Sequence, residues 1–171
     1  LYYSNPEWHH PYGYNPNSSH QWCSVQKDVV DTVTYREYIK NQITELLCNY
    51  GPIYTLFWDI PPKIEDPSLN QLARQLQPDI IINDRGWSQG DFSTPEREYQ
   101  TIEGVSFTRM TEACNSVDQQ SWGYRNAPDF HSVRYLTCSI DHFMSMGASY
   151  LLNVGPSAEG EITECYAERI R

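Results

Sequence analysis

Carboxylates at the ends of predicted strands are the residues of this sequence best placed to do chemistry. Asp59 directly follows Phe57 and Trp58, and Glu96 lies in a later polar loop. Two carboxyls about 5–5.5 Å apart hydrolyse a glycosidic bond with retention of configuration, and two about 6.5–9.5 Å apart with inversion. The faces of Trp and Tyr rings pack against the C–H faces of sugars. A carboxylate among aromatic side chains therefore indicates a sugar site, and a turn-capping role for Asp59 is the alternative.

A second polar group ends the next predicted strand, at Asn83, Asp84 and Arg85. A guanidinium donates several hydrogen bonds in a fixed plane, so Arg85 is suited to hold a carboxylate or a hydroxyl. Asn83 is suited either to bond a ligand or to brace the loop. An ion pair between Asp84 and Arg85 that stabilises the turn is the alternative.

Helix and strand signals alternate along the chain, and they predict the elements that position these residues. Short apolar runs indicate strands at the first residues and at 53–58, 79–83, 105–114 and 150–154, of which 105–114 is the weakest. Thr34 and Glu37 form a capping box that predicts the start of a helix ending at Gly51-Pro52. Asp66 and Pro67 predict the start of a second helix, and two more are predicted over 132–146 and 163–171.

Apolar strands that alternate with helices are typical of parallel β–α–β units, in which each strand is buried on both faces. Such units form either a barrel or an open sheet, and in both the site lies at the carboxyl ends of the strands. The pattern therefore predicts an α/β fold with Asp59 and Arg85 at one edge of the sheet.

The composition excludes several classes of protein. With 5 Trp, 13 Tyr and 5 Phe, the 171 residues carry too much apolar surface for a disordered chain. No stretch approaches the roughly 20 apolar residues of a membrane-spanning helix, and the first residues lack the pattern of a signal peptide. A net charge of −10 repels phosphate and disfavours a nucleic-acid partner. The five cysteines lack metal-ligand spacing, so we expect no metal site.

Six ordered motifs resemble the α-L-fucosidases of glycoside hydrolase family 29, and the resemblance covers nearly the whole chain. In order, they are Tyr2-Tyr3-Ser4 with Glu7-Trp8-His9-His10-Pro11, the strand end at Asp59, Asn83-Asp84-Arg85, Gly90-Asp91-Phe92-Ser93-Thr94-Pro95-Glu96, Ser121-Trp122-Gly123-Tyr124, and Leu151-Leu152-Asn153-Val154-Gly155-Pro156.

The resemblance implies a fold and an activity. The fold is the C-terminal part of a (β/α)8-like (TIM) barrel, with residues 1–171 as a partial catalytic domain. The early barrel strands and the family's C-terminal β-sandwich are then outside this chain, which we expect to be a fragment of a larger one. The implied enzyme is a retaining exo-glycosidase that hydrolyses terminal α-L-fucosyl residues through a covalent fucosyl-enzyme.

The resemblance also assigns roles to residues. Asp59 matches the nucleophile, and Glu96 matches one acid/base position of the family, with Glu98 and Glu112 as nearby alternatives. Arg85 resembles the residue that contacts the nucleophile or the sugar. The aromatic residues assigned to substrate binding are Tyr2, Phe57, Trp58 and Trp122. In one departure, Ile60-Pro61-Pro62 follows Asp59 where the family usually has a Gly.

The implied partner is a fucosylated oligosaccharide or glycoconjugate, with no cofactor, no membrane span and the oligomeric state left open. The family is mostly secreted, periplasmic or lysosomal, and we expect the same here. A catalytically inactive sugar-binding relative of the same fold is the alternative function, because the loop after Asp59 is altered. A barrel glycosidase for another sugar would explain the two carboxylates but not the six motifs.

Overall fold

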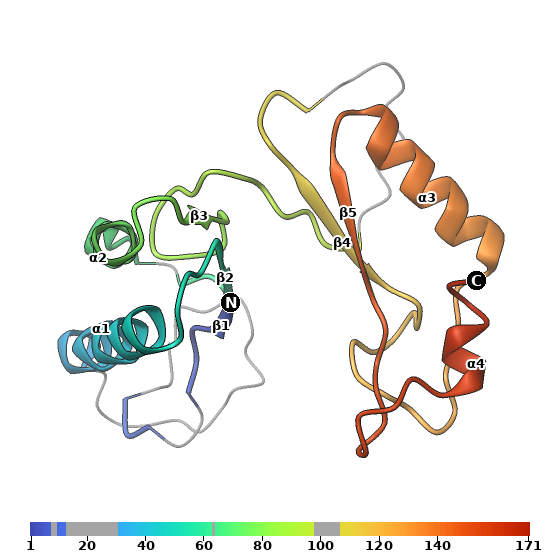
Figure 1. Cartoon of the computed structure of the whole chain (residues 1–171), viewed down its shortest axis with the longest axis horizontal. Coiled ribbons are helices and arrows are strands. Elements are labelled where there is room, and N and C mark those ends of the chain that lie inside the picture. The colour runs from blue at the N-terminus through green and yellow to red at the C-terminus, as the bar shows by residue number, and fades with distance from the viewer. Residues whose placement is uncertain (8–9, 13–30, 63, 98–106) are drawn as a thin grey trace. The chain divides into compact units, whose positions relative to one another are not determined.

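The computed structural model describes residues 1–7, 10–12, 31–62, 64–97 and 107–171, and Figure 1 shows their elements. The chain forms two compact units, Leu1–Phe92 and Ser93–Arg171. Both units contain parallel strands joined by helices, so the α/β class predicted from the sequence is confirmed.

The first unit is a parallel sheet in the order β1-β2-β3 with two crossover helices. β1 (Tyr2–Ser4) pairs with β2 (Thr55–Asp59), which pairs with β3 (Ile81–Ile82). α1 (Thr32–Asn49) and α2 (Pro67–Leu76) lie on the same side of these strands (Figure 1). The register aligns Ser4 with Asp59, so the carboxyl ends of β1 and β2 lie side by side.

The core of the first unit lies between the sheet and the two helices. Buried side chains recur every three or four residues in the helices and every second residue in β2, because only one face of each element is covered. They include Tyr35, Ile39, Ile43, Leu47, Leu56, Trp58, Leu69 and Ala73.

α1 begins three residues earlier than the capping box predicted. Asp31 is its N-cap, and the Asp31 carboxylate accepts hydrogen bonds from the backbone N–H and the hydroxyl of Thr34, at 2.9 and 2.6 Å. Glu37 instead binds Lys40 at 2.9 Å. The prediction that Thr34 caps the helix was therefore wrong, because a carboxylate one turn earlier satisfies its N–H. The start of α2, with Asp66 as cap and Pro67 in the first turn, is confirmed.

The second unit pairs β4 (Glu112–Ser116) with β5 (Ser149–Asn153) in parallel, and α3 (Val133–Ser145) connects them and packs against β5. β4 begins later than the predicted strand 105–114, whose residues 105 and 106 lie outside the described residues. α3 agrees with the predicted helix, with Ser132 as its cap. α4 (Glu164–Ala167) is a single turn where nine helical residues were predicted, and no side chain caps its start.

β2, β3 and β5 each have one more exposed face, not two buried faces as the apolar runs predicted, whereas residues 113–116 of β4 are all buried. Leu56 and Trp58 have no exposed surface, whereas Ile81 in β3 is 41% exposed and Leu151 in β5 is 47% exposed. Successive side chains of a strand point to opposite faces, and in β2, β3 and β5 one of these faces is less covered than the other.

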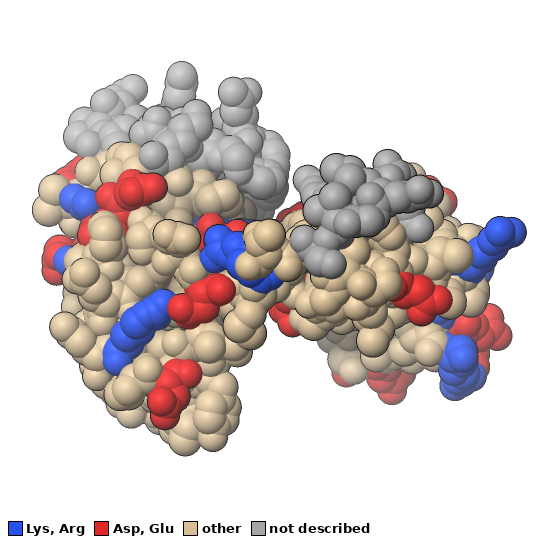
Figure 2. All heavy atoms as spheres, turned by 90° about the horizontal axis from the view of Figure 1, so that it is seen from above, with Lys and Arg blue, Asp and Glu red and all other residues tan. Residues whose placement is uncertain are grey.

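None of the helices in the described ranges is long and apolar enough to cross a membrane. On the face shown in Figure 2, acidic and basic side chains are scattered among uncharged ones.

Candidate functional site

Asp59 lies at the carboxyl end of β2, where two other predicted site residues bind its carboxylate. The Tyr2 hydroxyl donates a hydrogen bond to Asp59 Oδ2 at 2.5 Å. Arg85 Nη1 donates to Asp59 Oδ1 at 3.0 Å, and the Asp59 side chain keeps 23% of its surface exposed. The carboxylate is therefore oriented by one partner on each oxygen while remaining accessible.

Aromatic rings surround this carboxylate on the same face of the sheet. The Tyr2 ring stacks on the Phe57 ring with 5.9 Å between centroids and 21° between planes. The Arg85 guanidinium lies 5.5 Å from the centroid of the Phe57 ring. Tyr2 is 61% exposed, so it offers a ring face to a ligand beside Asp59. Such a surface can pack against a sugar and bond its hydroxyls.

Trp58 does not belong to this surface, which corrects the prediction that it binds substrate. Its side chain has no exposed surface, and its indole Nε1 donates to Asn70 Oδ1 at 2.9 Å inside the core. Phe57 and Asp59 share one face of β2, so Trp58 between them points to the opposite face, under the helices.

Asn83 braces the strand end, the second of its two predicted roles. Its side chain has no exposed surface. Its Oδ1 accepts from the backbone N–H of Trp58 at 2.8 Å, and its Nδ2 donates to the Trp58 carbonyl at 2.8 Å. The amide thus pairs with both backbone groups of the residue before Asp59.

Asn5 holds the other side of the same strand end, and the sequence reasoning missed it. Its backbone N–H and its Nδ2 donate to the Asp59 carbonyl at 3.0 and 2.8 Å. Its Oδ1 accepts from Trp87 Nε1 at 2.8 Å. The only signal in the sequence is an Asn directly after a strand, and that pattern does not reveal which carbonyl the amide will meet.

Ile60, directly after Asp59, has a φ of 57°, in the left-handed region. A β-branched side chain is disfavoured there by contact between Cβ and the backbone. The resemblance implies that the family usually has a Gly soon after the nucleophile, where this chain has Ile60, and the backbone conformation at Ile60 is one that suits Gly.

Glu96, the candidate acid/base, is exposed and belongs to the second unit. It forms an isolated parallel bridge with Cys114 of β4, and Arg97 N–H donates to the Cys114 carbonyl at 2.9 Å. Of the alternatives, Glu112 opens β4 and accepts a long 3.5 Å hydrogen bond from Ser149, and Glu98 lies outside the described residues. Because Asp59 belongs to the first unit, its pairing with Glu96 stays a prediction.

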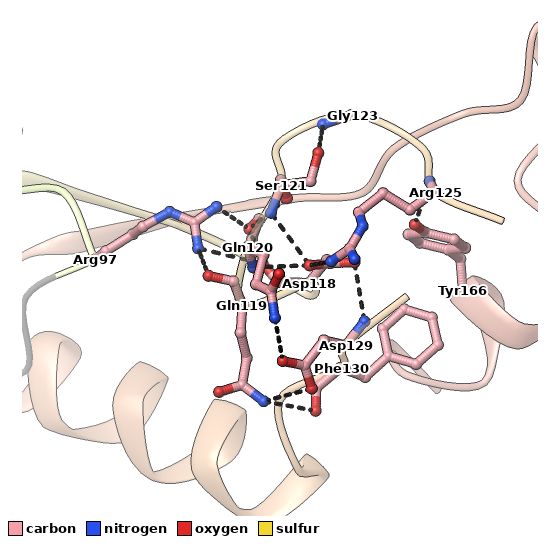
Figure 3. A network of polar contacts seen from close by, with 11 residues as sticks. Arg97, Asp118, Gln119, Gln120, Ser121, Gly123, Arg125, Asp129, Phe130 and Tyr166 are labelled. Carbon is pink, nitrogen blue, oxygen red and sulfur yellow. Dashed lines mark hydrogen bonds and ion pairs between the residues drawn. The ribbon is translucent and has the colours of Figure 1, made fainter. Parts of the chain in front are cut away.

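Trp122, the remaining predicted residue, is 37% exposed and stacks on a cation. The Arg97 guanidinium lies 4.4 Å from the centroid of its ring. Trp122 belongs to a segment that wraps around buried Asp118, which is 1% exposed (Figure 3). Sequence patterning did not reveal Arg97 or Asp118, because neither follows a strand or caps a predicted helix.

The Asp118 carboxylate accepts backbone N–H groups of this segment, which has no helix or strand to pair them. It accepts from the backbone N–H groups of Gln120, Ser121 and Asp129 at 2.8, 3.1 and 3.1 Å, and from Arg125 Nη1 at 3.3 Å. Burial raises the pKa of Asp118, but the backbone N–H groups and Arg125 outweigh it and hold the pKa below its ordinary value. The carboxylate is therefore ionised at neutral pH.

A group of three or more His, Cys, Asp or Glu side chains able to hold a metal ion is not found among the described residues. The arrangement at Asp59 offers a nucleophile or base, a guanidinium and a ring surface.

The model of the family described as α-L-fucosidase matches residues 1–171. The chain belongs to the α-L-fucosidase family. The family resemblance seen in the ordered motifs is thereby confirmed. Among curated α-L-fucosidases, the plasma enzyme of Pongo abelii is 27% identical over 187 residues, covering 100% of this chain and 38% of that relative. The α-L-fucosidase of Branchiostoma floridae is 28% identical over 186 residues, covering 100% of this chain and 39% of that relative.

Solved α-L-fucosidases share the fold. Isoenzyme 1 from Paenibacillus thiaminolyticus superposes with a TM-score of 0.77 at 27% identity, covering 99% of this chain and 46% of that one. AlfC from Lactobacillus casei, in complex with α-L-fucose product, superposes with a TM-score of 0.80 at 26% identity, covering 99% of this chain and 57% of that one. The chain thus spans between 38% and 57% of the length of these α-L-fucosidases.

Replacing the brace at Asn83 is expected to destabilise the chain. Asn83→Ala leaves the buried N–H and C=O of Trp58 without partners, which we expect to lower the free energy of unfolding by about 2–4 kcal/mol. Asn70→Ala is the comparison, because it removes the partner of one buried donor, the Trp58 indole N–H, whereas Asn83→Ala removes the partners of two buried backbone groups. Denaturant unfolding measures both, and a loss in Asn70→Ala as large as that in Asn83→Ala would contradict the brace.

The left-handed backbone at Ile60 predicts an inverted order of stability for two small residues. Ile60→Gly and Ile60→Ala lose the same packing, but Ala keeps the Cβ clash, so we expect the Gly variant to be more stable by about 1 kcal/mol. At Val33 in α1 the normal order holds, with Ala more stable than Gly by about 1 kcal/mol. Thermal unfolding of the four variants checks this, and Ala above Gly at position 60 would refute it.

The lowered pKa of Asp118 predicts acid sensitivity. Its folded pKa lies below the ordinary 3.8, so its contribution is complete above that value and is lost as the pH falls through the folded pKa. Asp118→Asn should therefore destabilise the chain at pH 7 by about 1–3 kcal/mol, and by less near pH 3. Urea unfolding at both pH values measures the difference. Exposed Asp79→Asn, the control, should change stability by less than about 0.5 kcal/mol at pH 7.

Proposed function

We propose that the protein containing this chain is a retaining α-L-fucosidase of glycoside hydrolase family 29. The observation that carries the proposal is the carboxylate of Asp59, oriented by Tyr2 and Arg85 beside the exposed Tyr2 ring, in a chain that the family model matches throughout. The substrate class is a glycan or glycoconjugate with a terminal α-L-fucosyl residue. The complex of AlfC with α-L-fucose product supports this choice of sugar.

In the proposed mechanism, Asp59 attacks the anomeric carbon and the bond to the leaving oxygen breaks. Glu96 donates its proton to that oxygen, so the aglycone leaves neutral and the fucosyl group stays bound to Asp59 as an ester. Glu96, now ionised, takes a proton from water, and the water oxygen displaces Asp59 from the anomeric carbon. Two inversions give net retention, and Glu96 recovers its proton.

The hydrogen bonds at Asp59 suit this role. Arg85 places a positive charge at one carboxylate oxygen, and the Tyr2 hydroxyl fixes the other oxygen. The Phe57 ring contacts both the Arg85 guanidinium and the Tyr2 ring. In the second unit, Trp122 supplies a further exposed ring for the aromatic wall, by which we mean the rings of Phe57 and Trp122 that would pack against the sugar.

We further propose that residues 1–171 form part of a (β/α)8-like catalytic barrel, the rest of which lies outside this sequence. The parallel strands and crossover helices of both units support this architecture. The plasma α-L-fucosidases among the relatives support a secreted or lysosomal location.

Two variants of the full-length protein test the mechanism. Asp59→Ala should lower hydrolysis of an aryl α-L-fucoside by at least about 10⁴-fold. Azide should restore turnover and give the β-fucosyl azide, because azide then makes a single displacement. Glu96→Ala should lose about 10²–10⁴-fold with a poor leaving group, and azide should give the α-fucosyl azide by attack on the covalent intermediate.

The stereochemistry separates the outcomes. Inversion by the wild type, or loss of activity in Asp59→Ala that azide does not restore, would overturn Asp59 as nucleophile. If Glu112→Ala instead yields the α-fucosyl azide, Glu112 is the acid/base. Fucose binding without turnover by an intact wild type would make the protein a sugar-binding relative.

A further inference from the structure

Arg97 follows the candidate acid/base directly and has an unusual backbone conformation. Its φ is 53°, and Ile60, which directly follows Asp59, is the only other non-glycine residue with positive φ in the described ranges. Left-handed backbone at a non-glycine residue persists only where the surroundings hold it. Here the Arg97 N–H donates to the Cys114 carbonyl of β4 at 2.9 Å, and Cys114 N–H donates to the Pro95 carbonyl at 2.8 Å. The segment carrying Glu96 is therefore fixed to the strand.

The Arg97 side chain reaches from that segment to a different one. Its Nη1 donates to the carbonyls of Asp118 and Gln119 at 3.2 and 2.6 Å, and its Nη2 donates to Ser116 Oγ at 2.8 Å. Figure 3 shows the guanidinium directed at this segment from the opposite end to Arg125. Three oxygen acceptors hold the guanidinium plane in place.

The Trp122 ring lies against this fixed guanidinium. The Arg97 Cζ is 4.4 Å from the ring centroid, well within the range of a cation–π contact. Trp122 still exposes 37% of its surface. The contact with Arg97 therefore leaves part of the ring accessible to a ligand. Ser116 Oγ also donates to the carbonyls of Asp118 and Ser121, at 2.5 and 3.1 Å, which ties the residue before Trp122 to the same frame.

We propose that Arg97 is a positioning residue that sets the Trp122 ring relative to Glu96 through its three hydrogen bonds and its stacking on the indole. This inference rests on the proposed function, in which Trp122 contacts the sugar and Glu96 protonates the leaving oxygen. One residue thereby couples the aromatic wall to the acid/base. Lysine cannot replace it, since an ammonium has no planar fork to bond three separate acceptors.

The test is a double-mutant cycle in the full-length protein, with Arg97→Gln, Trp122→Leu and the double variant. Gln is unbranched at Cβ, so the left-handed backbone meets the same constraint as with Arg. Each single variant should lower kcat/KM for an aryl α-L-fucoside by about 10-fold, and the double variant also by about 10-fold, not about 100-fold. The loss should fall mainly on KM, because ring contacts act on both ground and transition states. Arg97→Lys should recover only part of it.

Arg125→Gln provides the matched control. Arg125 carries the same charge and bonds the same Asp118, but among the described residues the cation over the Trp122 ring is Arg97 and not Arg125. Its effect on kcat/KM should add to that of Trp122→Leu. Additive effects for Arg97 and Trp122, equal to those of the control, would overturn the proposal.

A second measurement, the quenching of Trp122 fluorescence, reports the position of this ring independently of catalytic activity. The fluorescence emission of Trp122 is obtained by subtracting the emission of each protein that also carries Trp122→Leu from the emission of the same protein without it. Acrylamide should quench this emission more strongly in Arg97→Gln than in the wild type or Arg125→Gln. If the wild type does not hydrolyse the fucoside, the proposed function fails, and unchanged quenching in Arg97→Gln then overturns the positioning role separately.

Discussion

The first unit depends on two buried amides that hold the end of β2. A strand at the carboxyl edge of a parallel sheet needs partners for its last backbone groups, and β3 has only two residues. Asn83 supplies the missing donor and acceptor to Trp58, and Asn5 supplies donors to the Asp59 carbonyl. Unpaired buried backbone groups are strongly disfavoured, so these amides let the strand end abruptly at Asp59. The carboxylate is then carried by rigid backbone, as a preorganised site requires.

The second unit uses a carboxylate for the same purpose. The segment after β4 turns through several residues without helix or strand, and Asp118 accepts the N–H groups that a ladder would otherwise pair. Short polar side chains that bond nearby backbone commonly organise turns in this way. In the first unit, the backbone held by Asn5 and Asn83 carries the Asp59 carboxylate. In the second unit, the segment held by Asp118 carries the Trp122 ring, on which Arg97 stacks.

Local signals predicted the elements better than their ends. The existence of α1, the Asp66-Pro67 start of α2 and the range of α3 agree with the structure. The start of α1 was misplaced, since Thr34 and Asp31 are both acceptable caps by type and only the hydrogen bonds of the folded chain distinguish them. β4 and α4 were misplaced for a related reason: a short element depends on packing more than on its own residues.

The sequence by itself determined the family, the α/β class and the polar residues at the strand ends, because motif order and apolar spacing are properties of neighbouring residues. It placed Asp59, Tyr2, Phe57 and Arg85 in one site, and the structure brings these four together. Only the tertiary structure decided that Trp58 points into the core while its neighbours face the site, that Asn5 and Asn83 hold the backbone at Asp59, and that Arg97 bonds the segment after β4. Those facts depend on contacts between residues that are 54, 25 and 21 positions apart in the chain, and no local pattern encodes such pairings.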